Sequence, residues 1–458
     1  VRRRELRQQV LEALRNYLGA PGDEPFVPAD AHHAADLADV MWMDLEPEEA
    51  RKVFHSLELK AAAEVLAEAE DKFQALLLEG ADPEFVGKLL SELSYDDGAD
   101  LLEELPEELR LEVMCFVNPE DAAELRHLSE YDPHSAGGMM TTEFLTAGMS
   151  ESVGDILRRI KRDEGESESI HAVYVVDEVG TLQGVVSTRE LLEASIHDQV
   201  ANIMIPDVIK ARVDEDREDV AHRILHYNLD LIPVVDPRGV IVGVATADDA
   251  LEVLEEEGSE DALLLAGAHG GSGAGEPLLT MVGHRAPMLA IPVVAGLLMS
   301  KFMGYFQDPN VAVGQFQVFV PYVPLVLALS GNVGMQTSAV MVRGFAVGQI
   351  VHGRRLGVFL SEIKVGFALG LICSAFAGPA MGLLLGNMLH GLTLGFAVMI
   401  AMGWSATASS CIALGSEAVG LDPALVSGPL MMAVSDLSAV VLFLGMASAL
   451  ITGFSISI

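Results

Sequence analysis

The chain has 458 residues, which is too long for one domain and suggests about three. Its 67 acidic and 28 basic residues give a formal net charge of −39 at pH 7. This balance argues against nucleic acid as a partner, because phosphates are bound by Lys and Arg.

The charges are distributed unevenly along the chain. Six of the 28 basic and five of the 67 acidic residues follow residue 283, which leaves 22 basic and 62 acidic residues before it. The sequence therefore predicts an acidic soluble part followed by a nearly uncharged membrane part. Two interpretations of the acidic excess stay open, namely solubility in a salt-rich host and carboxylates that hold cations. Cys115, Cys373 and Cys411 are scattered singly, so no disulfide framework is expected.

Residues 1–132 show helical periodicity without the alternation of strands, and predict an acidic, all-helical N-terminal domain. Two segments, 37–66 and 89–125, resemble each other, and each has a Pro-Glu-Glu helix start. Repeated helical hairpins of this kind stack as a superhelix. Asp96 and Asp100 are four residues apart and would share one helix face, either as a solvated face or around a cation.

One unit is then written twice, because residues 171–187 closely resemble residues 231–246. Each copy reads as strand, Asp/Gly turn, strand and helix, with helices expected over 188–194 and 247–257. This is the pattern of a tandem pair of cystathionine-β-synthase-type (CBS) modules, which we place at 133–200 and 201–257. The resemblance implies a regulatory α/β domain. It also implies adenine-nucleotide (ATP) binding, for which Thr246 and Asp249 match the ribose-binding pattern, whereas Glu190 departs from it in the first copy.

The helix that leaves the second copy is the most acidic stretch of the chain, and we assign residues 248–283 to a connecting segment. So many carboxylates on one helix repel each other, and a divalent cation would relieve the repulsion. An exposed helix in an acidic protein is the other interpretation. Residues 214–219 form a second acidic cluster, and Gly267–Gly275 reads as a flexible linker.

Residues 284–458 contain five apolar runs, at roughly 286–305, 318–342, 362–386, 391–414 and 425–450, each near or above the ~20 residues that span a bilayer. We therefore expect a multi-pass protein of the inner or plasma membrane. The basic loops at Arg285 and at 343–355 place the soluble part in the cytoplasm, Asp308 outside and the C-terminus outside. An odd number of spans favours a homodimer with a shared axial path.

Polar groups stand out inside two of these runs. Gly331-Asn332-Val333-Gly334-Met335-Gln336 follows a Pro-broken apolar run and brings amide oxygens to membrane depth. Asp436 is the only acid of the last run. Amide oxygens and a carboxylate are ligands that a hard divalent cation prefers.

With Ser135-Ala136-Gly137-Gly138-Met139-Met140-Thr141, these features occur in an order that resembles the MgtE family of magnesium channels over essentially the whole chain. The resemblance implies a pore site at Asp436, with Asn332 lining the path and Glu362 as a functional membrane acid. It also implies a cytosolic Mg²⁺ sensor formed by acidic residues, namely Asp96, Asp100, Asp216, Glu218, Asp249, Glu252, Glu257, Glu260 and Asp261. Met335 and Gly428 stand where the family commonly has Asn, so two amide oxygens near the expected pore are absent.

The expected function is thus uptake of divalent cations, selective for Mg²⁺ and gated by cytosolic Mg²⁺ bound between the N-terminal and CBS domains. One alternative is a secondary carrier for another divalent cation such as Co²⁺. Another is a membrane protein that senses adenine nucleotides through its CBS modules. No enzyme is expected, because the His-Glu-x-x-His signature of CBS-bearing intramembrane proteases is absent.

Overall fold

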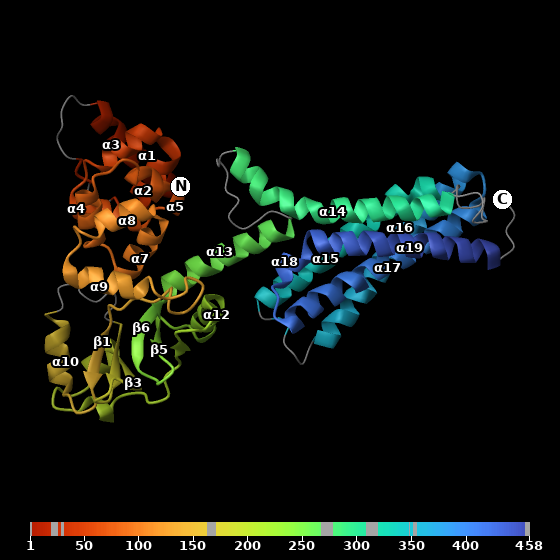
Figure 1. Ribbon diagram of the computed structural model, residues 1–458. Coiled ribbons are helices and arrows are strands. Elements are labelled where there is room, and N and C mark those ends of the chain that lie inside the picture. The colour runs from red at the N-terminus through yellow and green to blue at the C-terminus, as the bar shows by residue number, and fades with distance from the viewer. Residues whose placement is uncertain are drawn as a thin grey trace. The chain divides into compact units, whose positions relative to one another are not determined.

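The computed structural model describes residues 2–19, 26–28, 32–162, 171–266, 278–307, 319–347, 349–350 and 355–453. The predicted linker at 267–275, Asp308 and the basic loop positions 351–354 lie outside the described residues. The chain divides into two compact units, Val1–Leu254 and Glu255–Ile458, which are described separately (Figure 1).

The first unit begins with helices that follow one another closely in sequence. Their bounds are α1 Arg2–Gly19, α2 Ala34–Asp44, α3 Pro47–Phe54, α4 Leu59–Ala67, α5 Asp71–Leu78, α6 Pro83–Leu90, α7 Tyr95–Glu104, α8 Glu107–Val113 and α9 Pro119–Leu128. Pro at the first helical position and an Asp or Asn cap start α6 and α9. From α2 to α9, each helix contacts the second helix after it. This stacking confirms the predicted superhelical domain.

Two similar α/β units follow. The first contains β1 Leu145–Gly148, α10 Val153–Ile160, β2 Ala172–Val176, β3 Leu182–Ser187 and α11 Thr188–Glu193, and is followed by the 3₁₀ turn η1 Val200–Asn202. The second contains β4 Ala211–Arg212, α12 Arg217–Tyr227, β5 Leu231–Val235, β6 Ile241–Thr246 and the start of α13 Ala247–Leu265, whose residues from Glu255 onward belong to the second unit. In each sheet a parallel pair is followed by an antiparallel hairpin, with a register irregularity at the same place.

The two hairpins also pair with each other. Gly180 and Gly239 both have a positive φ in their turns, which glycine adopts without strain. Leu182 N donates to Gly239 O at 3.0 Å, and Ile241 N donates to Gly180 O at 3.2 Å. The doubled unit seen in the sequence is therefore a symmetric pair in the fold.

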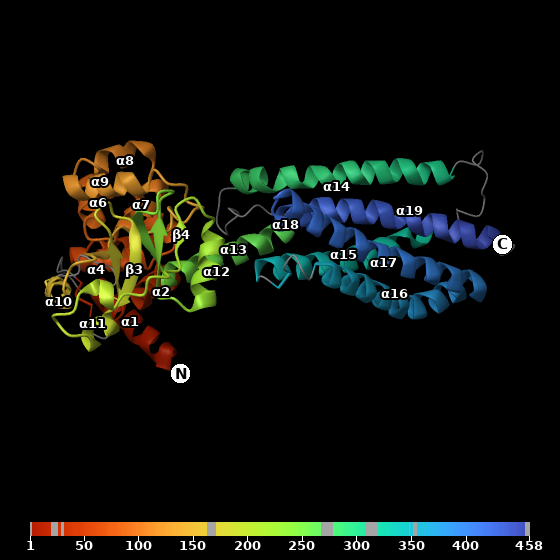
Figure 2. The same cartoon turned by 90° about the horizontal axis from the view of Figure 1, so that it is seen from below.

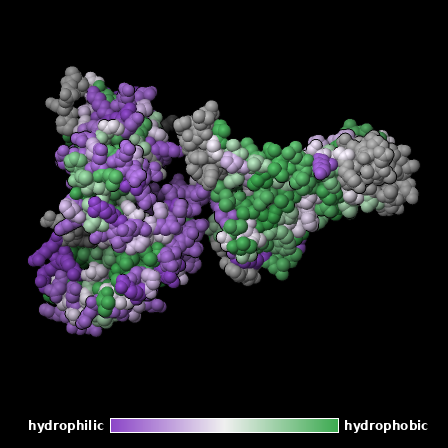
Figure 3. Space-filling view, in the orientation of Figure 1, coloured by the Kyte–Doolittle hydropathy of each residue, from purple (hydrophilic) through white to green (hydrophobic). Residues whose placement is uncertain are grey.

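The second unit consists of long apolar helices. They are α14 Leu278–Gln307, α15 Val323–Ala346 (after the 3₁₀ turn η4 Val320–Tyr322), α16 Arg355–Leu385, α17 Met388–Val419, the short α18 Pro423–Ser427 and α19 Pro429–Gly453. Five of them are long and apolar enough to cross a membrane, which confirms the predicted spans. Figure 3 shows hydrophobic side chains gathered over these helices and hydrophilic ones over the N-terminal and CBS domains.

Two helix boundaries differ from the sequence prediction. The third span begins at Arg355 rather than at 362, since the guanidinium of Arg355 pairs with the carboxylate of Glu417 on α17 and so adds polar turns to an apolar helix. The helix of the second CBS module was expected to end at 257, but α13 runs without a break from Ala247 to Leu265 and so also forms the acidic connecting helix expected within 248–283.

The centre of the membrane unit is α17, which packs against α15, α16 and α19. Its contact with α16 is very close: a Cβ on Gly391 would lie 2.2 Å from the backbone N of Gly382. Small residues therefore let these two backbones touch, as is common in membranes. By contrast, α14 packs on α19 at the edge of the bundle (Figure 2).

Candidate cation sites

The carboxylate of Asp436 lies inside the membrane unit, between α19 and α15. A Cβ on Gly331 would lie 3.2 Å from Asp436 Oδ1, so the acid sits directly against the backbone of α15. This oxygen is buried and has no hydrogen-bond partner among the described residues. Since an unpaired polar atom is costly in an apolar span, the position indicates a ligand or a partner group.

Serine hydroxyls hold the helices together beside this acid. Ser405 Oγ on α17 donates to Ser330 O on α15 at 2.7 Å and also shares a hydrogen bond with Ser435 Oγ on α19. Ser409 Oγ donates to Ser405 O at 2.8 Å. Ser405 and Ser409 are four residues apart, so they lie on one polar face of α17.

Asn332 lies on a face of α15 that the described residues leave exposed, together with Met335 and Gln336. Its Nδ2 donates to Ala328 O at 2.7 Å, which leaves the amide oxygen for a ligand. The structure does not bring Glu362 to Asp436. Glu362 on α16 is instead hydrogen-bonded to Thr337, roughly 9 Å farther along α15 than Gly331.

In the first unit, acidic residues from three segments come together. Asp96, Asp97 and Asp100 lie on α7, Glu143 follows the bridge between Thr141 and Val244, and Asp249 lies in the first turn of α13. Burial and the neighbouring carboxylates raise the pKa of Asp100, Glu143 and Asp249 to about 7, and that of Asp97 to about 6.

Asp96 is the most buried member of this cluster, with 8 % of its surface exposed. Burial and the charge of Asp248 raise its pKa, and its Oδ1 has no hydrogen-bond partner among the described residues. The charge of Glu252 contributes to the raised pKa of both Asp97 and Asp100. Four of the expected sensor residues thus meet here, namely Asp96, Asp100, Asp249 and Glu252.

Sequence reasoning missed Asp97 and Glu143. Asp97 is adjacent to Asp96 and could have been included on spacing alone. Glu143 carried no local signal, because it reaches the cluster only through the tertiary fold.

Asp216 and Glu218 have other interactions. Asp216 caps α12, with its Oδ1 accepting from Glu218 N at 2.9 Å. Glu218 Oε1 lies 3.6 Å from His222 Nε2.

A second, smaller acidic group lies in the other unit. Burial and the charges of Asp422, Glu257 and Glu260 raise the pKa of Asp261 to about 6. Asp422 was not among the predicted site residues. It also caps α18, where its Oδ1 accepts a hydrogen bond from Ala424 N at 2.7 Å. Gly428 lies close by in the fold, where a Cβ would be only 2.6 Å from Leu264 O at the end of α13. An Asn at this position would not allow so close an approach.

The pair proposed for nucleotide binding is held by its own hydrogen bond. Thr246 Oγ1 donates to Asp249 Oδ2 at 2.6 Å, and Thr246 is buried. In the first copy, Ser187 and Glu190 form a capping box at the equivalent place. Asp249 therefore belongs to both the acidic cluster and this candidate site.

The chain matches three protein families in the order of its domains. The MgtE intracellular N domain matches residues 32–134, the CBS domain matches 136–197 and 200–256, and MgtE, described as a divalent cation transporter, matches 323–446. The magnesium transporter MgtE of Thermus thermophilus is 33% identical over 432 residues, which are 92% of this chain and 93% of that protein. MgtE of Bacillus subtilis is 27% identical over 85% of each chain.

A solved structure is also similar to this chain. The crystal structure of the cytosolic domain of the Mg²⁺ channel MgtE in complex with ATP is 36% identical. It covers 49% of this chain and 91% of its own, with a TM-score of 0.47. On the match to the Thermus protein along nearly its whole length, the chain belongs to the MgtE family of magnesium transporters.

Proposed function

We propose that the chain is a Mg²⁺ channel in which Asp436 holds the ion within the membrane and acidic cytosolic sites close the path when Mg²⁺ is plentiful. Membership of the family makes the chain a transporter rather than an enzyme. The observation that carries the proposal is the buried Oδ1 of Asp436, which lies against the backbone of Gly331 and has no hydrogen-bond partner in the part of the chain that the structure describes. Among the described residues of α19, Asp436 is the only Asp or Glu.

Mg²⁺ gives up its waters reluctantly and is usually bound through those that remain. In the proposed pore, Asp436 accepts hydrogen bonds from inner-shell waters, and the amide oxygen of Asn332 accepts from the outer shell. One carboxylate neutralises half of the ion's charge. A homodimer that places two Asp436 side chains on a shared axis would neutralise the other half. Inward movement is driven by the membrane potential, at about 2.3 kcal/mol per charge per 100 mV.

The exposed polar residues of α15 support the homodimer. Asn332 and Gln336 are exposed within a span that is otherwise apolar. Amide groups in a bilayer require a protein partner or a water-filled path. A second copy on this face would provide both.

The sensor is formed, in this proposal, by Asp96, Asp100, Asp249 and Glu252 in one cluster and by Glu257, Glu260 and Asp261 in another. Asp216 and Glu218 remain part of the proposal as a separate site on α12. Burial, and after it repulsion between neighbouring carboxylates, raises the pKa of Asp100, Asp249 and Asp261. Mg²⁺ binding removes the repulsion and so favours the compact state. The response is a population shift set by the difference in Mg²⁺ affinity between closed and open states.

We further propose that the protein spans the inner or plasma membrane with its N-terminal and CBS domains in the cytosol and its C-terminus outside. Arg343 at the end of α15 and Arg355 at the start of α16 support this orientation, because cytoplasmic loops are rich in Lys and Arg. Glu362, paired with Thr337, would act on the cytoplasmic side of the Asp436 site.

Mg²⁺ flux into liposomes that contain the purified protein tests the pore assignment. Asp436→Asn should abolish flux, because it removes the charge and keeps the shape. The control is Val434→Ala on the same helix, whose side chain is 44% exposed. Normal flux through Asp436→Asn would refute the assignment.

The same assay tests gating. Asp100→Asn combined with Asp249→Asn should keep the pore open at internal Mg²⁺ that closes the native protein. Glu48→Gln combined with Glu84→Gln, two exposed acids of the same domain, should close normally. Flux that requires a Na⁺ or H⁺ gradient, or that favours Co²⁺, would support the alternative of a secondary carrier.

Adenine-nucleotide binding at Thr246 and Asp249 is a second proposal. The hydrogen bond between them presents a carboxylate at the end of β6, where it could accept from ribose hydroxyls. Calorimetric titration with ATP should show binding that Asp249→Ala removes. No heat with the native protein would exclude it.

A further inference from the structure

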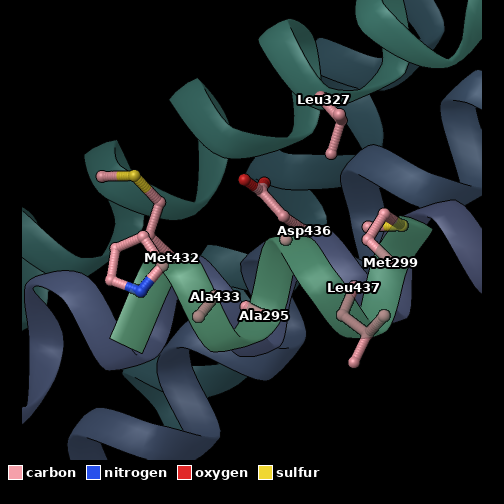
Figure 4. Close-up of a pocket in the computed structure, with 9 residues that line it drawn as sticks. Ala295, Met299, Leu327, Met432, Ala433, Asp436 and Leu437 are labelled. Carbon is pink, nitrogen blue, oxygen red and sulfur yellow. The ribbon is translucent and has the colours of Figure 1, made fainter. Parts of the chain in front are cut away.

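A cavity of about 170 Å³ lies beside Asp436, between α14, α15 and α19. Figure 4 shows Met299 of α14, Leu327 of α15 and Leu437 of α19 around it, with the Asp436 carboxylate among them. Its lining is apolar except for this one acid. The cavity therefore combines hydrophobic walls with a single negative charge.

The apolar walls of the cavity do not by themselves suit hydrated Mg²⁺, which in the proposed function is held by Asp436 together with Asn332 and a second copy of Asp436, neither of which lines the cavity. The waters around this ion need hydrogen-bond acceptors, and Met299, Leu327 and Leu437 offer no good ones. Apolar walls favour a ligand that removes its own hydrocarbon surface from water. Asp436 Oδ1, which no described residue hydrogen-bonds, favours a cation at one end of that ligand.

The volume limits the size of the ligand. A cavity of about 150 Å³ accepts a benzene molecule in another protein, so the present one accepts a single six-membered ring. The charge should be an ammonium group, since an alkyl amine with a pKa near that of lysine is protonated at neutral pH.

We propose that this cavity binds small amphiphilic monocations, with the hydrocarbon body against Met299, Leu327 and Leu437 and the ammonium group at Asp436. Such a ligand would occupy the carboxylate and compete with Mg²⁺. This competition rests on the proposed function, in which Asp436 holds the ion. Binding itself does not depend on it.

Access to the cavity is expected past α14. Among the transmembrane helices, α14 packs chiefly on α19, and its outer face is exposed at Val293 and Leu297. Pro287 and Pro292 interrupt its backbone hydrogen bonds, which allows a helix to bend. We therefore expect an amphiphilic amine dissolved in the bilayer to enter the cavity past α14.

Two glycines of α14 give a matched pair of variants. Gly296 lines the cavity and has no heavy atom within 4 Å of where a Cβ would lie, so Gly296→Leu can fill the space. Gly304 has equally open surroundings but does not line the cavity. Gly304→Leu therefore controls for a bulky residue on the same helix.

The first measurement is the thermal stability of the purified full-length protein with cyclohexylammonium, cyclohexanol or methylammonium. A ligand that binds the folded state raises the melting temperature. Cyclohexylammonium should do so at concentrations at least tenfold lower than either of the other two, since each lacks one half of the recognition. Asp436→Asn and Gly296→Leu should abolish the effect, and Gly304→Leu should retain it.

The second measurement is Mg²⁺ flux in liposomes. Cyclohexylammonium should inhibit flux through the native protein and Gly304→Leu, and at least tenfold less through Gly296→Leu. Equal inhibition by cyclohexanol, equal stabilisation by all three compounds, or no response in either assay would overturn the proposal. If Gly296→Leu is inactive, the stability measurement decides. Two results together would separate this proposal from the proposed function. If cyclohexylammonium stabilises the native protein but Asp436→Asn still conducts Mg²⁺, the pore assignment is refuted and the binding site stands.

Discussion

Gly331 determines how close the Asp436 carboxylate comes to α15. A Cβ there would lie 3.2 Å from Oδ1, closer than most side chains tolerate. The acid would have to move by a few tenths of an ångström. Ser405 of α17 is hydrogen-bonded both to Ser330 O of α15 and to Ser435 Oγ of α19, and so holds α15 and α19 at this spacing. The strain of an added Cβ therefore falls on the Asp436 carboxylate.

We therefore predict that Gly331→Ala lowers Mg²⁺ flux by roughly tenfold while the protein remains folded, because small displacements of a binding group are expensive. Liposome flux and thermal melting should be measured together. Gly415→Ala on α17 is the control, since a Cβ at that position has no heavy atom within 4 Å. Unchanged flux in Gly331→Ala would show that the carboxylate does not need this contact.

The acidic cluster of the first unit leads to a prediction on pH. The pKa of Asp100, Glu143 and Asp249 is raised to about 7, above the ordinary range near 4. The folded state therefore binds more protons than the unfolded state between these values. The free energy of unfolding must fall as the pH rises from about 4 to about 7.

Without Mg²⁺, the soluble part should thus melt several degrees lower at pH 7.5 than at pH 5.5, and Mg²⁺ should reduce this difference by pairing with the carboxylates. Calorimetry of the full-length protein at both pH values measures the effect. The double variant Asp100→Asn and Asp249→Asn should show a smaller difference. An equal pH dependence in that variant would assign the effect to other groups, such as histidines.

At the same scale, sequence spacing identified part of the cluster. Asp96 and Asp100 share a helix face by their separation of four residues, and this was visible without a structure. Glu143 was not, because its approach to α7 depends on the bridge between Thr141 and Val244, residues far apart in sequence. Local periodicity carries no information on such contacts.

At the scale of the elements, the end of α13 makes a specific contact in the membrane unit. Leu264 is buried with Val342 of α15 and Ala424 of α18. Gly428, just before α19, allows the backbone carbonyl of Leu264 to approach it. Gly428 is visible in the sequence, but its neighbour is not, because Leu264 lies far from it along the chain and meets it only in the tertiary fold.

Gly428→Ala should therefore loosen the docking of α13, because its Cβ would lie 2.6 Å from Leu264 O and the backbone must shift. In the proposed gating, this variant conducts at internal Mg²⁺ concentrations that close the native protein. The measurement is Mg²⁺ flux at increasing internal Mg²⁺ concentration. Gly445→Ala on α19 is the control, because a Cβ at that position meets none of the described residues within 4 Å. A native closing curve in Gly428→Ala would show that this contact does not contribute to closure.

For the whole molecule, the apolar runs predicted the five spans, and the doubled unit predicted the CBS pair. Both patterns are repeated over many residues, so they survive local irregularity. The helix faces were less predictable. The runs are apolar all round, and only the packing shows that α17 is central while α15 presents Asn332, Met335 and Gln336 outward. This exposed face is where a second copy is proposed to bind.

The face can be tested by disulfide cross-linking in a variant whose native cysteines, Cys115, Cys373 and Cys411, are replaced by serine. Met335 is 40% exposed on α15, so Met335→Cys should form a disulfide-linked dimer when membranes are oxidised. Phe376 on α16 is 76% exposed, and Phe376→Cys should stay monomeric because its face would meet lipid. Cross-linking through Phe376→Cys but not Met335→Cys would place the subunit contact on α16. The Asp436 side chains of two subunits would then not share an axis, and the pore would have to form within one chain.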